Sequence, residues 1–354
     1  MFVIRDVSLD DADNFRFSST MLEVAERQGL WAKGQAFDFT KIFSYGEARH
    51  KYYSGRRLWR ALSLFNASLQ LPTEYDDLVM DPAYPFSVVP DRLLGWRDLS
   101  AVMRDTFEAT HLDLGRGLAA GPFGVVDRYD SDPSQHGAFE RPIGTYRMAY
   151  SYIGEVVGSQ RESTDGREGG SDEVIVWFGP HASVTNVYLP VFASMAHAPR
   201  SLSTGSVKTV DRASAYWAFR YVKQLSLGHF SMSLPLIRAR QKKWEEAGEK
   251  IVRQICTDWE KSSPEETTAA LESLATHCVQ DWWQLADELV LRYGDGWEWG
   301  WGNDAASAEP KEPPAPQPLS YDATWLDMVG YATSCSERAA EWPVAAKIEA
   351  FNKL

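Results

Sequence analysis

The chain has 354 residues, of which 44% are hydrophobic and 24% charged, a composition typical of a globular protein with a large core. Its formal net charge of −13 repels phosphate groups, which argues against nucleic-acid binding. No apolar run reaches the roughly eighteen residues of a membrane-spanning helix, and no secretory signal pattern is present, so we predict no membrane association and the compartment is not indicated. The three cysteines and seven histidines lack metal-binding spacing, which predicts no disulfide framework, metal or other cofactor.

Short regular elements alternate with proline-rich loop at the start of the chain. The pattern predicts a strand at residues 1–7 and helices at residues 20–27, 54–69 and 97–110. Four prolines make residues 71–90 mostly loop or edge strand. In the last of these helices Arg104 and Glu108 have i,i+4 spacing, for which the simplest interpretation is a weak ion pair on the helix surface.

The middle of the chain predicts a sheet. Residues 141–157 alternate in side-chain character, residues 174–178 are an unbroken β-branched and aromatic run, and residues 187–192 suit a third strand. We expect one antiparallel sheet, with the polar hairpin 158–172 mobile and exposed. The glycine-rich turn 117–124 lacks the Lys and Ser/Thr of a phosphate-binding loop, so we interpret it as structural.

Polar groups crowd the connection between the second and third of these strands. His181, Ser183, Thr185 and Asn186 supply hydrogen-bond donors and acceptors directly after a strand end. Such a loop is a candidate functional site, and its simpler interpretation is a satisfied polar turn.

Helices dominate beyond residue 211. The segment 214–227 is apolar on too many sides for a surface helix, so we expect it to be buried, and Arg220 within it then needs a carboxylate partner. Residues 235–259 and 265–293 read as two long amphipathic helices in a hairpin. The packing stripe predicted for the first of them consists of Trp244, Ala247, Ile251, Ile255 and Trp259.

Ordered sequence blocks extend from near the first residue to Gly296. They are STMLEVAERQGLW (19–31), YYSGRRLWR (52–60), MRDTFEATHLDL (103–114), GLAAGPFG (117–124), ERPIGTYRMAYSYIGEV (140–156), VIVWFGPHASVTNVYLP (174–190), DRASAYWAFRYVKQLS (211–226) and WWQLADELVLRYGDG (282–296). In this order the blocks resemble the dipeptidase family of N-terminal-nucleophile cysteine peptidases, the group that contains bacterial dipeptidase A and the eukaryotic secernins.

The resemblance implies a fold and a reaction. The fold is α+β, a four-layer αββα sandwich in which two antiparallel sheets face each other. It would occupy residues 1–300, followed by an Ala, Glu and Pro rich linker at 303–318 and a short appendage at 319–354. The reaction is hydrolysis of dipeptides, in which an N-terminal Cys thiolate attacks the scissile carbonyl and forms an acyl-enzyme. Small peptides are then the expected partners, with homo-oligomerisation as a further possibility.

Five residues would form the site that the resemblance implies. Asn186 would donate its amide to the developing oxyanion, and Arg220 or Arg147 would place a positive charge near the thiolate. His181 and Trp177 would line the pocket. The structural alternatives are a turn role for Asn186, an ion pair for Arg220 and a core position for Trp177.

The start of the chain departs from the family pattern. Its first residues, MFVIRD, look like an interior strand of the family and do not supply the N-terminal Cys nucleophile. Cys256, Cys278 and Cys335 have no free α-amine beside the sulfur. We therefore expect this chain to be the C-terminal portion of a longer enzyme, inactive alone.

Two alternatives to this interpretation stay open. One is a catalytically dead relative that binds peptides or partners, and the other is a purely structural or interaction role. A truncated sandwich would uncover apolar sheet surface, so we expect Trp177, Tyr188 and the aromatic face of residues 141–157 to be exposed.

Overall fold

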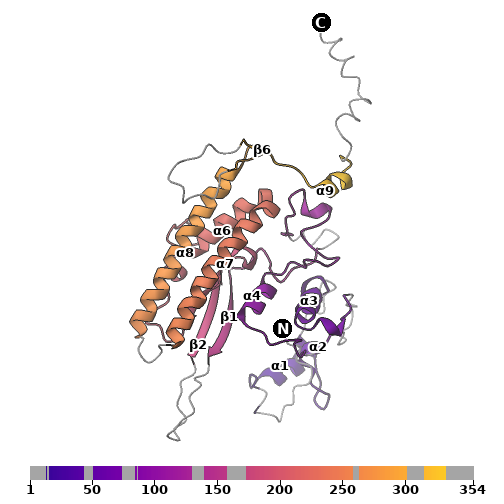
Figure 1. Cartoon of the computed structure of the whole chain (residues 1–354). Coiled ribbons are helices and arrows are strands. Elements are labelled where there is room, and N and C mark those ends of the chain that lie inside the picture. The colour runs from indigo at the N-terminus through magenta and orange to yellow at the C-terminus, as the bar shows by residue number, and fades with distance from the viewer. Residues whose placement is uncertain are drawn as a thin grey trace. The chain divides into compact units, whose positions relative to one another are not determined.

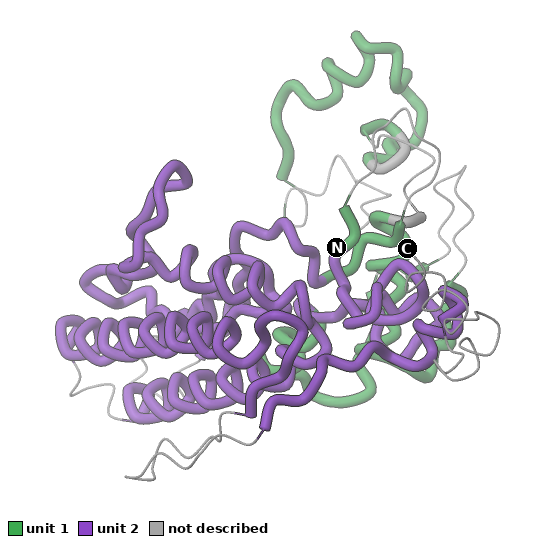
Figure 2. The backbone as a smooth tube through the Cα atoms, turned by 90° about the horizontal axis from the view of Figure 1, so that it is seen from above, with its two compact units in different colours: residues 1–102, 128–143 green, residues 103–127, 144–354 purple. Residues whose placement is uncertain are grey.

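The computed structural model describes residues 13, 16–43, 51–73, 84–85, 87–129, 139–157, 173–257, 263–300 and 315–331. The chain divides into two compact units (Figure 2), unit 1 being Met1–Val102 with Arg128–Ile143 and unit 2 being Met103–Asp127 with Gly144–Leu354. Helices occur together with small antiparallel sheets, which confirms the predicted α+β class. The strand predicted at 1–7, the hairpin at 158–172 and most of the predicted linker lie outside the described residues.

Unit 1 is helical over its described residues. Its elements are α1 (Met21–Arg27), α2 (Phe39–Phe43), a π-helical turn (Lys51–Gly55), α3 (Arg56–Phe65), a 3-10 turn (Ala67–Leu69) and most of α4 (Trp96–Met103). A small core of Ala25, Phe37 and Ile42 holds the first of these together. The helix predicted at 54–69 is interrupted at Asn66, whose φ of −142° leaves the helical region and whose side-chain amide donates to Val89 O at 2.7 Å.

Helix α4 is shorter than the sequence pattern predicts. It ends at Met103 instead of continuing to residue 110, and Phe107 has a φ of 67°. The reason is local competition for backbone donors: Asp105 Oδ1 accepts from Phe107 N at 2.9 Å, and Glu108 Oε2 accepts from Thr106 N at 2.8 Å. The predicted surface ion pair of Arg104 with Glu108 is therefore wrong, because Arg104 leaves the helix and is buried.

Unit 2 contains the predicted antiparallel sheet. Strand β2 (Glu173–Pro180) pairs with β1 (Tyr150–Val157) on one side and with β3 (Leu189–Phe192) on the other. Strand β1 begins at Tyr150, nine residues later than the alternation at residue 141 suggests. The register sets Trp177 opposite both Ile153 and Pro190.

Alternation along these strands gives the sheet two different faces. One face is buried and consists of Ser151, Ile153, Ile175, Trp177, Gly179, Pro190 and Phe192. The other face is apolar: Tyr150, Tyr152, Gly154, Val156 and Val174 are exposed, Val176, Phe178 and Val191 are half-buried, and Pro180 and Leu189 at its end next to the loop are buried. It is called the open face below. The predicted exposure is confirmed for Tyr150 and Tyr152, at 57% and 61%, and is wrong for Trp177 and Tyr188, at 1% and 0%.

Three helices of unit 2 lie beside this sheet (Figure 1): α6 (Ala215–Ser226), α7 (Phe230–Thr257) and α8 (Pro264–Arg292). A Cβ added at Gly248 of α7 would meet Pro190 Cδ at 3.0 Å and Trp177 Cζ3 at 3.5 Å, so α7 packs closely on the buried face. Helices α7 and α8 form the predicted hairpin, and a capping box at Ser263 and Glu266 starts α8. No helix in the described ranges combines the length and apolar character needed to cross a membrane.

Smaller elements complete unit 2. Helix α5 (Arg200–Ser203) contacts α6 and α8, and β4 (Tyr293–Gly294), β5 (Trp297–Glu298) and β6 (Gln317–Pro318) form a second antiparallel sheet. Helix α9 (Ala323–Met328) follows it. The ring of Tyr321 lies edge-to-face on Phe123, with centroids 5.6 Å apart, so the segment after the predicted linker packs on the glycine-rich turn.

Candidate functional site

The loop between β2 and β3, residues 181–188, is entirely buried. It leaves the sheet at His181, whose N donates to Ala149 O at 2.8 Å, and makes a 3-10 turn at Ser183–Thr185. Gly179, the residue of β2 beside this loop, has no room for a side chain, because a Cβ there would overlap the amide of Asn186 and lie 3.0 Å from Tyr188 Cε1. The missing side chain lets the Asn186 amide lie directly against the strand.

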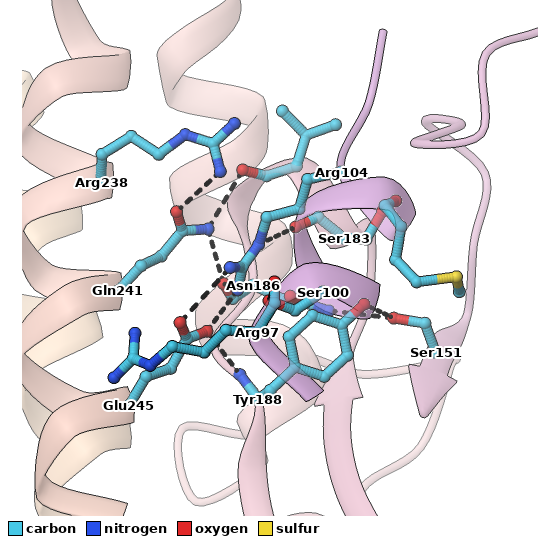
Figure 3. Close-up of polar contacts among 12 residues, drawn as sticks. Arg97, Ser100, Arg104, Ser151, Ser183, Asn186, Tyr188, Arg238, Gln241 and Glu245 are labelled. Carbon is cyan, nitrogen blue, oxygen red and sulfur yellow. Dashed lines mark hydrogen bonds and ion pairs between the residues drawn. The ribbon is translucent and has the colours of Figure 1, made fainter. Parts of the chain in front are cut away.

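A buried ion pair holds the backbone of this loop (Figure 3). The Arg104 guanidinium pairs with the Glu245 carboxylate, and the two side chains are 8% and 4% exposed. Arg104 Nε also donates to Ser183 O at 3.1 Å, and Nη2 donates to Asn186 O at 3.1 Å. Its guanidinium carbon lies 4.9 Å from the ring centroid of Tyr188. One arginine therefore fixes both ends of the turn.

Helix α7 supplies further loop contacts. Gln241 Nε2 donates to Val184 O at 3.1 Å and to Asn186 O at 2.6 Å, and Glu245 Oε1 accepts from Tyr188 N at 3.2 Å. Arg104, Gln241 and Glu245 are called the loop clamp below. The clamp pairs with four backbone groups of the loop, Ser183 O, Val184 O, Asn186 O and Tyr188 N, and so fixes the backbone from which the Asn186 side chain projects.

The Asn186 side chain is fully buried and incompletely hydrogen-bonded. Its Nδ2 lies 3.4 Å from Ser151 Oγ, which in turn is 2.8 Å from Tyr188 Oη. Its Oδ1, like Thr185 Oγ1, has no hydrogen-bond partner among the described residues. A buried polar atom without a partner costs about 1–3 kcal/mol, a cost that is more often retained at functional sites than elsewhere.

His181 is also buried with a free polar atom. It is 6% exposed, its Nδ1 has no partner among the described residues, and its ring meets Tyr216 edge-to-face at 5.4 Å between centroids. Burial lowers the pKa of His181 to about 4, assisted by the positive charges of Lys223 and Arg220. The imidazole is therefore neutral near pH 7.

The two cations near His181 both lie on α6. Arg220 is half-buried, its Nη1 donates to Tyr216 Oη at 3.1 Å, and its guanidinium carbon is 5.2 Å from the Trp217 ring centroid. The predicted carboxylate partner of Arg220 is not found among the described residues. The fully buried cation of this helix is Lys223, which pairs with Asp127 at 2.6 Å and whose pKa is lowered by burial. Lys223 is not among the predicted site residues, because a lysine in an apolar helix gives no sign in the sequence of its distant partner Asp127.

The structure brings together three of the five predicted site residues. His181 and Asn186 lie on one loop, and Arg220 reaches His181 through Tyr216. Trp177 lies in the core and donates from Nε1 to Glu155 Oε2 at 2.8 Å, whereas Arg147 is exposed over the Tyr146 ring. The catalytic and binding roles given to these residues stay predictions.

Two of the three cysteines lie within the described residues, and both have a raised pKa. Burial is the main cause for each, and Cys278 is completely buried, which raises its thiol pKa well above the ordinary value. Neither environment favours the thiolate. Across the described ranges, no group of three or more His, Cys, Asp or Glu residues is arranged to hold a metal ion.

Comparison with known families agrees with the ordered sequence blocks. A search of curated proteins gave no match. A family model described as peptidase family C69 matches residues 2–243, well over half of the chain, and the match spans the sheet, the loop 181–188 and the part of α7 that carries Gln241. The chain therefore belongs to peptidase family C69, the dipeptidase family of cysteine peptidases, and this membership supports a peptidase function.

Proposed function

We propose that this protein binds dipeptides for hydrolysis by a thiol acyl-enzyme mechanism, with the loop 181–188 as the substrate side of the active centre and with a nucleophile other than Cys256 and Cys278. The observation that carries the proposal is Asn186: its side chain is fully buried, its Nδ2 has two N–H groups and donates only to Ser151 Oγ at 3.4 Å among the described residues, and the loop clamp immobilises its backbone. A positioned amide with a spare N–H donor is what a developing negative charge requires.

The amide would act when the scissile carbonyl becomes tetrahedral. Attack by a thiolate forms a C–S bond and moves the carbonyl electron pair onto oxygen, where an N–H of Asn186 Nδ2 donates to it. Collapse of this intermediate breaks the C–N bond, and the amine leaves with the proton that the base took from the thiol. Water then hydrolyses the thioester to the free acid and the regenerated thiol. Preorganised donors of this kind contribute about 10²–10³ to kcat.

The thiolate is assigned to neither Cys256 nor Cys278. Their raised pKa values keep them protonated near pH 7, and the family resemblance gives the nucleophile to an N-terminal Cys whose own α-amine is the base. We accordingly expect the 354-residue chain to bind dipeptides without releasing amino acids.

The open face of the β1–β2–β3 sheet supports the finer fold proposal, an αββα sandwich. Its side chains are all apolar or glycine, which is the composition of a face that packs on a second sheet. If this face remained in water, its side chains would instead be mostly polar, and each strand would alternate between apolar and polar residues.

The test measures binding and hydrolysis separately. The chain is titrated with a panel of dipeptides by calorimetry, and amino-acid release is followed with ninhydrin. Binding without release supports the proposal, whereas a panel that is neither bound nor hydrolysed overturns it. Release that disappears in Cys256→Ser or Cys278→Ser overturns the assignment of the nucleophile.

A further inference from the structure

The residues around His181 carry two positive charges, and a carboxylate neutralises only one of them among the described residues. The titratable groups that act on His181 are Lys223 and Arg220, and both are cations. Lys223 is neutralised by Asp127 at 2.6 Å, in a pair whose two side chains are almost completely buried. Arg220 has no such counter-charge among the described residues. One positive charge is thus left over.

Three side chains that can donate hydrogen bonds are in contact beside this charge, Arg220 with Tyr216 and Tyr216 with His181. Arg220 Nη1 donates one hydrogen bond to Tyr216 Oη at 3.1 Å, which leaves the other N–H groups of the guanidinium available as donors. The Tyr216 hydroxyl accepts that bond and retains its own O–H, and its ring contacts His181. The His181 Nδ1 is buried and has no partner in the described part of the chain. A neutral imidazole with its proton on Nδ1 would donate a third hydrogen bond.

We propose that Arg220, Tyr216 and His181 bind the C-terminal carboxylate of the dipeptide. This inference rests on the proposed function and names how that site recognises its substrate. A carboxylate matches the single unbalanced positive charge, and its planar pair of oxygens matches the fork of a guanidinium. A phosphate dianion would leave one negative charge in a half-buried site, inside a protein that already has a net charge of −13.

The position of the three residues on the loop gives the carboxylate a role in specificity. His181 begins the loop and Asn186, the proposed oxyanion donor, follows the 3-10 turn that ends at Thr185. In a dipeptide the free carboxylate is one residue beyond the scissile carbonyl, about 3.8 Å between Cα atoms. A carboxylate held at the start of the loop therefore restricts hydrolysis to substrates that end one residue after the cleaved bond.

The experiment uses calorimetry to measure the affinity of each dipeptide that the chain binds. It compares this affinity with those of the corresponding C-terminal amide and of the corresponding N-acetyl dipeptide. We expect the amide to bind at least about tenfold more weakly than the free acid, since a charge-assisted hydrogen bond to Arg220 is lost. An acidic side chain is tested as a second source of the carboxylate with a dipeptide amide that contains Asp. Tighter binding of this amide than of its Asn counterpart would show that the site takes side-chain carboxylates and would overturn the C-terminal assignment.

Variants locate the effect. Arg220→Met should weaken binding of the free acid about tenfold and leave the affinity of the amide unchanged, and Tyr216→Phe should act in the same direction with a smaller loss. The matched control is Arg212→Met, because Arg212 is an exposed arginine of unit 2 that lies 4.1 Å over the Trp283 ring. Circular dichroism confirms that each variant is folded.

The outcomes separate this inference from the proposed function. Equal affinity for acid and amide, or an Arg220→Met variant that weakens both equally, overturns the carboxylate site and leaves dipeptide binding intact. A chain that binds no dipeptide in any form overturns the proposed function, and the carboxylate site falls with it.

Discussion

The two faces of the β1–β2–β3 sheet come from alternating residues of the same strands and differ in almost every other property. The covered face meets α7, and beside it the buried loop clamp holds the loop 181–188. The open face has only apolar side chains and glycine, with Tyr152 61% and Val156 66% exposed. The difference indicates that the polar chemistry of this unit is concentrated on one side, while the other side is suited to packing.

The largest expected effect is loss of the loop clamp. Glu245→Ala should lower the free energy of unfolding by about 3–5 kcal/mol, because it leaves the Arg104 guanidinium buried without its carboxylate. Urea unfolding followed by tryptophan fluorescence measures it. The control is Glu246→Ala. Glu246 is the next residue of α7 and is exposed, with its Oε1 4.0 Å from Lys242 Nζ. Its substitution should change the free energy of unfolding by less than about 0.5 kcal/mol. Equal effects of the two substitutions would contradict the clamp.

A pair of glycines compares the two faces directly. Gly179→Ala should destabilise by about 1–3 kcal/mol, because its Cβ would overlap the Asn186 amide on the covered side. Gly154→Ala on the neighbouring strand places its Cβ in open space and should be neutral or slightly stabilising. Thermal and urea unfolding of both variants test this. A Gly154→Ala variant as unstable as Gly179→Ala would mean that the open face is already packed.

The neutral imidazole of His181 should make stability depend on pH. Its folded pKa of about 4 lies below its ordinary value of 6.5, so unfolding takes up a proton between these values and stability is lost as the pH falls. The contribution lost between about pH 7 and pH 5 is roughly 2 kcal/mol. His181→Gln should remove that part of the pH dependence, whereas His277→Gln, at an exposed position of α8, should not. Identical pH profiles of wild type and His181→Gln would show that the ring is not buried neutral.

The smallest expected effect on stability comes from the open face. Replacing Tyr152 and Val156 by Thr should change the free energy of unfolding by less than about 0.5 kcal/mol, because both side chains are already in water. The same change should roughly halve the fluorescence of a bound hydrophobic dye, since it removes contiguous apolar surface. Val207→Thr, which is 80% exposed and lies outside the sheet, should leave the signal unchanged. A wild-type chain that is monodisperse by light scattering and does not bind the dye would contradict the open face.

Sequence periodicity predicted the elements that depend on local pattern. The unbroken apolar run of β2 and the long amphipathic segments of α7 and α8 were placed correctly, because an apolar β-branched run and helical spacing are visible within a few residues. The burial of β2 on both faces that this run suggested is wrong, because one face of the sheet is open. Boundaries failed where side chains compete for the backbone, as Asp105 does after α4. The candidate loop was recognised because His181 and Asn186 stand out against apolar neighbours.

The residues that hold that loop could not be found in the same way. The most buried stripe of α7 includes Gln241 and Glu245, which pattern analysis assigns to the solvent side. The predicted stripe ran from Trp244 to Trp259 instead, and of its members Ile255 is buried. The partner of Glu245 is Arg104, which lies 141 residues earlier and was predicted to be on a helix surface. Polar residues of this kind are buried only because distant partners satisfy them, and a single sequence does not show which residues are partners.

Helix α7 has a consequence for how this sequence can change in length. Gln241 and Glu245 lie on one face because they are four residues apart, and Gly248 continues that face towards Trp177. Inserting or deleting one residue between Gln241 and Gly248 would rotate the remainder of the helix by about 100°, since each residue turns an α-helix by that angle. Either the loop would lose its supporting side chains or the sheet would lose its close contact with the helix. In this stretch the spacing of the residues is constrained as strictly as their identity.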